Sequence, residues 1–87
     1  MANIHLTIVT PEGRFYDGDA EKIIVRTTTG DVCILPNHID YAAAIGSGEA
    51  RVTTANGEMR KAFAEGGLLH VSNNEVQLIG NRFEWRE

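Results

Sequence analysis

Turn-forming residues divide this chain into short segments of about eight to twelve residues. Within the segments, inward-pointing apolar residues alternate with other residues, as Ile4, Leu6 and Ile8 do near the start. A period of two is typical of half-buried β-strands. No window repeats apolar residues with helical spacing, so we expect no helix beyond one turn near residues 41–44. The predicted fold is all-β: an antiparallel two-sheet β-sandwich of about eight to ten short strands.

Two residue pairs predict tight hairpin turns. Asn56-Gly57 is the strongest signal, because a type I′ turn needs positive φ at both central residues and these two adopt it at low cost. Asn73-Asn74 predicts a second tight turn, between the last two strands. Further breaks between strands are expected at residues 11–13, 17–19 and 66–67, which all contain glycine.

An unbroken apolar run at residues 32–35 predicts a strand that is buried on both faces. Pro36 lacks a backbone donor and restricts the residue before it, so the strand must end there. Asn37 and His38 then follow in a short loop. Cys33 lies inside the apolar run, and we expect it to serve packing and not to act as a nucleophile.

Composition limits the classes of partner and compartment. The 87 residues, 43% of them hydrophobic, are enough for one globular domain with one core. A formal net charge of −4 argues against nucleic acid or an anionic lipid surface as the main partner. A single cysteine forms no internal disulfide, and neither a signal-peptide pattern nor a long apolar run is present. We therefore expect a soluble, unexported protein in a reducing compartment.

Catalytic, cofactor-binding and metal-binding residues are not expected. His5, His38 and His70 lack the spacing of a metal site, although His5 and His70 are expected on neighbouring strands. The glycines at residues 46–48 and 66–67 lack the lysine and the helix of a phosphate-binding loop. No nucleophile, base and oxyanion site assemble from the pattern, so the chain is predicted not to be an enzyme.

Residues 30–38, Gly-Asp-Val-Cys-Ile-Leu-Pro-Asn-His, resemble the glycine-acidic-apolar-x-apolar-Leu-Pro-x-His signature of the ε subunit of rotary F-type ATP synthases. The opening segment at residues 5–11, the strand entry at residues 21–23 and the glycine pair at residues 66–67 follow in family order. The resemblance covers essentially the whole chain. Cys33 departs from it, since the family usually carries glycine there, and residues 39–41 replace the usual Ala-Pro-Leu.

The resemblance implies a non-catalytic central-stalk subunit that couples rotation of the γ subunit to the membrane c-ring in proton- or sodium-driven ATP synthesis. The implied partners are γ and the polar loops of the c-ring. The implied location is the cytoplasmic face of the bacterial inner membrane, or the matrix or stroma side in an organelle, with membrane association only through the complex. The alternative is a small all-β ligand- or protein-binding module unrelated to ATP synthase, because sandwiches carry many functions.

The resemblance also predicts the division of the chain. Residues 1–80 are expected to form the sandwich domain, and residues 81–87 a tail where the family's C-terminal helical hairpin would begin. We expect no such hairpin within these 87 residues. Since the family's inhibition of hydrolysis and binding of ATP belong to the hairpin, neither is expected of this chain.

Five residues are predicted to contact the c-ring: Thr29, Gly30, Asp31, Asn37 and His38. Asp31 and His38 lie at opposite ends of the strand at residues 32–35, so the five residues are not expected to form one contiguous tip. The contact is expected to consist of individually weak polar interactions.

Overall fold

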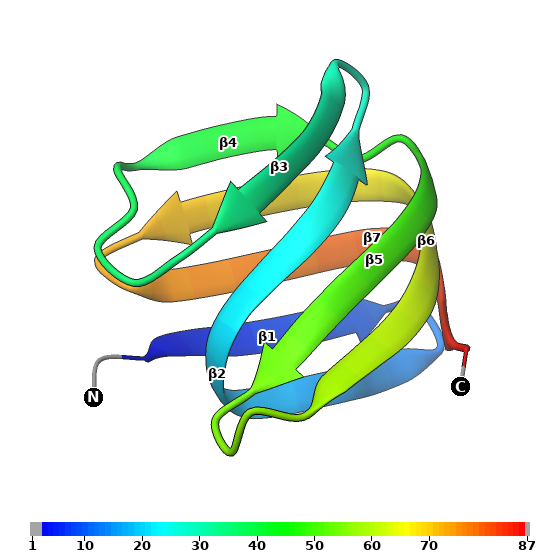
Figure 1. Cartoon of the computed structure of the whole chain (residues 1–87). Helices are drawn as coiled ribbons and strands as arrows, with labels where there is room; N and C mark the ends of the chain where they lie inside the picture. The colour runs from blue at the N-terminus through cyan, green and yellow to red at the C-terminus, as the bar shows by residue number, and fades with distance from the viewer. Residues whose placement is uncertain (1–2, 87) are drawn as a thin grey trace.

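The computed structural model describes residues 3–86, and within that range it contains seven strands and no helix (Figure 1). The strands are β1 (Ile4–Thr10), β2 (Gly13–Thr27), β3 (Gly30–Ile34), β4 (Tyr41–Ala44), β5 (Ser47–Thr54), β6 (Met59–Ser72) and β7 (Glu75–Trp85). The all-β prediction is confirmed. The one helical turn that was expected near residues 41–44 does not form, because these residues are strand β4, which pairs with β6. No helix that is long and apolar enough to span a membrane occurs in the described residues.

The strands form two packed layers, because the three longest strands bend from one layer into the other. The first layer contains β1 and β4 with residues 13–20 of β2, 67–72 of β6 and 75–80 of β7. The second contains β3 and β5 with residues 22–27 of β2, 59–65 of β6 and 82–85 of β7. In Figure 1 the strands of the second layer cross those of the first at an angle.

The strands are fewer and longer than predicted, since two expected breaks are absent. Residues 17–19 stay extended because Asp17, Gly18 and Asp19 pair with β1. Residues 66 and 67 lie inside β6, where both glycines have positive φ, 71° and 115°. Positive φ at two successive glycines bends a strand without ending it.

The pairing is antiparallel except between β1 and β7, which run parallel from His5 and Glu75 to Val9 and Ile79. The predicted antiparallel arrangement therefore holds for every pair of strands in the described residues except this one. The first and last strands share no turn, so no local signal predicts how they pair. Their contact brings the two ends of the chain into one sheet.

Both predicted hairpins form, with one difference in turn type. Asn73 and Asn74 have φ of 52° and 63°, as a type I′ turn requires. In the other hairpin Asn56 does not have positive φ, and only Gly57 does, at 89°. The Gly57 N–H donates to the Thr54 carbonyl oxygen at 2.9 Å, so residues 54–57 form the turn and Gly57 is its last residue. The predicted type I′ turn at Asn56-Gly57 was therefore wrong.

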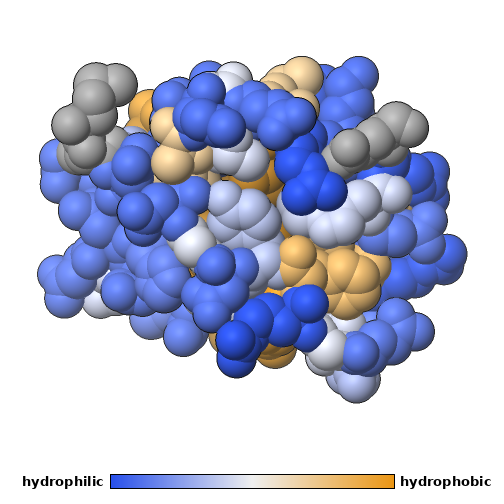
Figure 2. All heavy atoms as spheres, turned by 90° about the horizontal axis from the view of Figure 1, so that it is seen from below, coloured by the Kyte–Doolittle hydropathy of each residue, from blue (hydrophilic) through white to orange (hydrophobic). Residues whose placement is uncertain are grey.

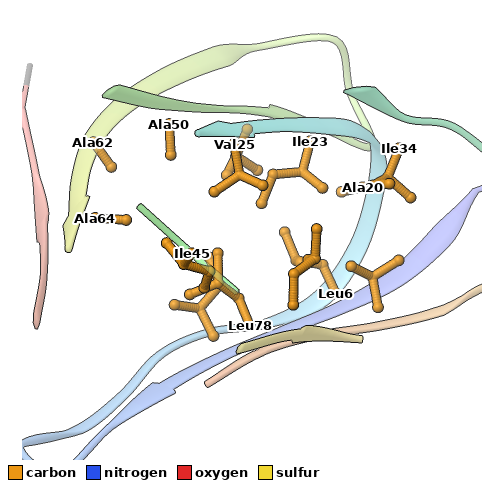
Figure 3. Packing of buried hydrophobic residues seen from close by; sticks show 14 of the residues in the cluster. Leu6, Ala20, Ile23, Val25, Ile34, Ile45, Ala50, Ala62, Ala64 and Leu78 are labelled. Carbon is orange, nitrogen blue, oxygen red and sulfur yellow. The ribbon is translucent and has the colours of Figure 1, made fainter. Parts of the chain in front are cut away.

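The core lies between the layers, and small residues of one layer face large residues of the other. Ala50 and Ala62 point from the second layer toward the side on which Ile45 and Leu78 lie (Figure 3). Small side chains on one face let the layers approach and pack at interior density. The fully buried larger side chains are Ile4, Leu6, Ile8, Ile23, Val25, Ile34, Val52, Leu69, Val71, Val76, Leu78 and Phe83.

Strand β3 is the last strand in the sheet order and pairs only with β2. Ile34 is buried, but Cys33 is exposed and Leu35 is 49% exposed. The predicted burial of residues 32–35 on both faces was wrong, and so was the packing role of Cys33, because each layer of a two-layer sandwich has one face in the core and one face in solvent. β3 ends at Ile34, before Pro36, as predicted.

The last strand continues past the predicted domain boundary at residue 80. β7 extends to Trp85, and Phe83 is only 2% exposed. The Arg60 guanidinium lies over the Trp85 ring, 3.9 Å from its centroid. Residues 81–85 therefore belong to the sheet. The ends of the predicted domain and tail, residues 1, 2 and 87, lie outside the described residues.

Candidate docking surfaces

The β2–β3 hairpin holds three of the predicted contact residues. The Thr27 hydroxyl donates to the Gly30 carbonyl oxygen at 2.6 Å and accepts from the Thr29 N–H at 3.2 Å. Arg26 Nε lies 2.5 Å from Asp31 Oδ1, and this hydrogen bond lowers the pKa of the Asp31 carboxyl. Asp31 is thus an ionised, partly exposed group held by its neighbour.

The loop at residues 35–40 holds the other two predicted residues. Asn37 has φ of 67°, and the His38 N–H donates to the Leu35 carbonyl oxygen at 3.2 Å. His38 Nδ1 lies 2.7 Å from the Ile39 carbonyl oxygen, which only accepts, so Nδ1 carries the proton. The His38 ring packs edge-on against Tyr41, with centroids 5.7 Å apart. These contacts order the half-buried ring.

The β6–β7 turn meets this loop. The Asn37 N–H donates to Asn74 Oδ1 at 2.6 Å, and Asn74 Nδ2 donates to Asn37 Oδ1 at 3.4 Å. An open cavity of about 360 Å³ lies here, lined by Asn37, His38, Asp40, Asn73 and Asn74. Sequence reasoning explained Asn73 and Asn74 by turn chemistry alone. No local signal indicated that the turn shares a surface with a loop 37 residues away.

The five predicted residues form two groups at opposite ends of β3 (Figure 1). Thr29, Gly30 and Asp31 lie at the β2–β3 turn, whereas Asn37 and His38 lie beside the β6–β7 turn. The expectation that they form no single tip agrees with this arrangement.

The outer face of the first layer carries parallel rows of cross-strand neighbours. We call one of them the apolar row; Leu68 and Ile79 at its centre are 46% and 48% exposed. The next row is small or polar. The apolar row consists of Ala44, Leu68, Ile79 and Val9, and the next row of Ala42, His70, Gln77 and Thr7. Seen from below in Figure 1, the edge of the two layers is mostly hydrophilic with an apolar area near its middle (Figure 2).

His5 lies between two carboxylates. Its Nε2 is 2.9 Å from Asp17 Oδ1, and its Nδ1 is 3.2 Å from Glu75 Oε1. Hydrogen bonds to Asp17 and then Glu75 raise the pKa of His5. The expectation that His5 and His70 lie on neighbouring strands was wrong, because β7 lies between β1 and β6. In residues 3–86 no three potential ligands gather as a metal site.

An apolar row on one outer face and ordered polar loops at the strand ends are the features of a protein-docking module. The chain belongs to the family of ATP synthase delta/epsilon chain β-sandwich domains, whose model matches residues 3–86. The suspected resemblance is thereby confirmed, and a module unrelated to ATP synthase is excluded.

Relatives and solved structures agree with this membership. The chain is 40% identical over 83 residues to the ATP synthase epsilon chain of Clostridium acetobutylicum, covering 95% of this chain and 62% of the relative. It is 35% identical to the sodium ion specific epsilon chain of Propionigenium modestum, covering 93% of this chain and 58% of the relative. The chain thus spans about three fifths of the length of these relatives.

The fold recurs in mitochondrial ATP synthases. A chain of the Euglena gracilis OSCP/F1/c-ring structure matches with a TM-score of 0.90 at 21% identity, over 98% of this chain and 54% of that chain. A chain of the Tetrahymena thermophila central stalk and c-ring structure matches with a TM-score of 0.74 at 16% identity, over 92% of this chain and 64% of that chain. At these identities the likeness establishes the fold.

Proposed function

We propose that the chain is the β-sandwich part of a non-catalytic central-stalk subunit, joining γ to the c-ring so that proton- or sodium-driven rotation is coupled to ATP synthesis. The observation that carries this is the presence of an apolar row and ordered polar loops on one doubly layered scaffold. A rotor connection must resist deformation between its two contacts, and strands that belong to both layers supply that stiffness. On this proposal the chain associates with the membrane only through the complex, on the cytoplasmic side in bacteria or the matrix or stroma side in organelles.

The apolar row is the surface that we assign to γ. Leu68 and Ile79 are directly opposed on β6 and β7, and Val9 and Ala44 extend the row to β1 and β4. Burying such side chains against an apolar partner contributes about 25 cal/mol per Å². Contiguous apolar side chains rimmed by polar residues are typical of a protein interface.

Replacing Leu68 or Ile79 by aspartate tests this assignment. Burial of an unpaired carboxylate opposes docking, so L68D and I79D should weaken copurification with γ at least tenfold, which corresponds to about 1.4 kcal/mol. Gln77→Glu, which adds a charge one row away on the same face, is the control and should bind as the parent does. Unchanged binding of both aspartate variants to γ would disprove the assignment.

The polar groups at the two ends of β3 are the surface that we assign to the c-ring. Exposed polar contacts contribute about 0–1 kcal/mol each, so Asp31→Ala or His38→Ala alone should leave coupling largely intact. Cross-linking tests more directly whether these groups lie next to the c-ring. Cys33 is itself exposed, so the test requires a Cys33→Ser background.

In that background, a cysteine introduced as D31C or H38C should form a disulfide with a cysteine in the c-subunit polar loop when the assembled complex is oxidised. The unmodified background without a new cysteine is the control and should give no such product. Cross-links to γ alone, or none in an active complex, would contradict the proposed orientation.

A further inference from the structure

We propose that Asn74 is a positioning residue, which holds the loop at residues 35–40 in the geometry needed for c-ring contact. The inference deepens the proposed function and rests on it. It concerns a residue on the β6–β7 turn that does not itself belong to the predicted contact set. Its side chain is joined to Asn37 by two hydrogen bonds, which we call the amide clasp: Asn37 N–H to Asn74 Oδ1 at 2.6 Å, and Asn74 Nδ2 to Asn37 Oδ1 at 3.4 Å.

The loop at residues 35–40 needs an external support. It leads from β3 in the second layer to β4 in the first, passing the end of the β6–β7 hairpin (Figure 1). The hydrogen bonds of His38 are internal to the loop, to Leu35 and Ile39. Ile39 is 76% exposed, so it contributes little buried surface. The ring contact of His38 with Tyr41 joins the loop to β4, and the amide clasp is the polar connection that joins it to the β6–β7 turn.

The backbone of Asn74 is fixed by two features, the tight turn and a hydrogen bond to β1. Its φ of 63° belongs to the type I′ turn that closes the β6–β7 hairpin. Its carbonyl oxygen accepts from the His5 N–H at 2.8 Å, which ties the turn to β1. The side chain thus projects from a point fixed by three strands. Ordering the loop in advance lowers the entropy lost when a partner binds.

Glycine substitution separates the side chain of Asn74 from its backbone role. Because glycine adopts positive φ without cost, Asn74→Gly removes the amide and keeps the turn. Asn73→Gly is the matched control, since φ of Asn73 is 52° and its amide is not part of the clasp. Asn74→Asp keeps an oxygen acceptor for the Asn37 N–H and is the rescue variant.

Hydrogen exchange and cross-linking test the inference, and the melting temperature checks that the variant stays folded. In the 87-residue chain, hydrogen exchange of the Asn37 amide should accelerate at least tenfold in N74G, remain at parental rate in N73G and be largely restored in N74D. The melting temperature of N74G should shift by less than about 4 °C, the lower end of the range for a 1 kcal/mol change in a domain of this size. In the assembled complex, the N74G change should lower the yield of the H38C cross-link to the c-subunit loop severalfold, and N73G should not.

The outcomes separate this inference from the proposed function. Parental exchange of the Asn37 amide in N74G would overturn the clasp. Faster exchange with an unchanged cross-link yield would overturn the positioning role. If H38C never reaches the c-subunit loop even with Asn74 intact, the proposed c-ring contact of this loop fails and the positioning role fails with it, whereas the exchange data still decide whether the clasp exists.

Discussion

His5 joins three strands through its imidazole ring. It extends from β1 to Asp17 on β2 and to Glu75 on β7, while Asp17 also pairs with Arg14 at 3.1 Å. Asp19 is its direct cross-strand neighbour on β2. Both partners only accept when ionised, so a neutral ring, which has a single N–H, satisfies one of them. Only the imidazolium donates to both carboxylates.

This arrangement predicts a pH-dependent stability. Because the pKa of His5 is raised above 6.5 in the folded state, its contribution is complete below 6.5 and is lost as pH rises through the folded value. The free energy of unfolding should therefore fall above pH 6.5. His5→Gln should remove that slope, and His70→Gln, on the outer face of β6, should keep it; urea titrations from pH 5.5 to about 9 measure both. An identical slope in His5→Gln would refute the assignment.

Cys33 illustrates what residue type alone leaves open. The apolar run around it predicted burial, and the alternation of side chains along β3 does place Ile34 in the core. Whether the other face is covered depends on whether another layer lies outside the strand. No third layer covers the outer face of β3 in the described residues, so Cys33, on the face opposite Ile34, is exposed to solvent.

Among the elements, β6 depends most on a special backbone position. Its two halves pair with different strands, β5 before the glycine pair and β4 after it. At Gly67 a Cβ atom would lie 2.1 Å from the Ile79 carbonyl oxygen of β7, and φ is 115°. The close approach of the two backbones leaves no room for a side chain.

We therefore expect Gly67→Ala to destabilise the fold by about 2–4 kcal/mol, through strain at positive φ and displacement of β7. Gly18→Ala is the matched control, because it lies in extended backbone with no atom within 4 Å of a new Cβ. That change should alter stability by no more than about 0.5 kcal/mol. Chemical denaturation of both variants gives the comparison, and equal stability of the two would contradict the packing at Gly67.

The last strand completes the sandwich because it contributes to both layers. Residues 82–85 of β7 pair with the first half of β6 in the second layer. Phe83 packs against Phe15, with ring centroids 5.4 Å apart, and against Trp85 at 5.0 Å. The predicted tail therefore contains part of the core.

A chain ended after Gly80 should be largely unfolded. Loss of one buried phenylalanine side chain costs about 3–5 kcal/mol, and the total stability of such a domain is about 5–15 kcal/mol. The truncated chain also loses four paired residues of β7 and the Trp85 contacts. A chain ended after Trp85 keeps all of these and should remain folded. Dispersion of amide signals in NMR spectra distinguishes the two, and a well-dispersed spectrum of the shorter chain would show that the domain ends at residue 80.

Local patterns determined the all-β class, the inward faces of β1, β2 and β5 and the turn at residues 73–74, because alternation and turn chemistry act between near neighbours. The short motifs from residue 5 to residue 67 were also sufficient for the family. Only the tertiary structure decided the parallel pairing of β1 with β7, the exposure of Cys33 and the contact of Asn37 with Asn74. Each of these depends on which distant strands lie side by side, and that order follows from packing of the whole core, for which no single segment carries a signal.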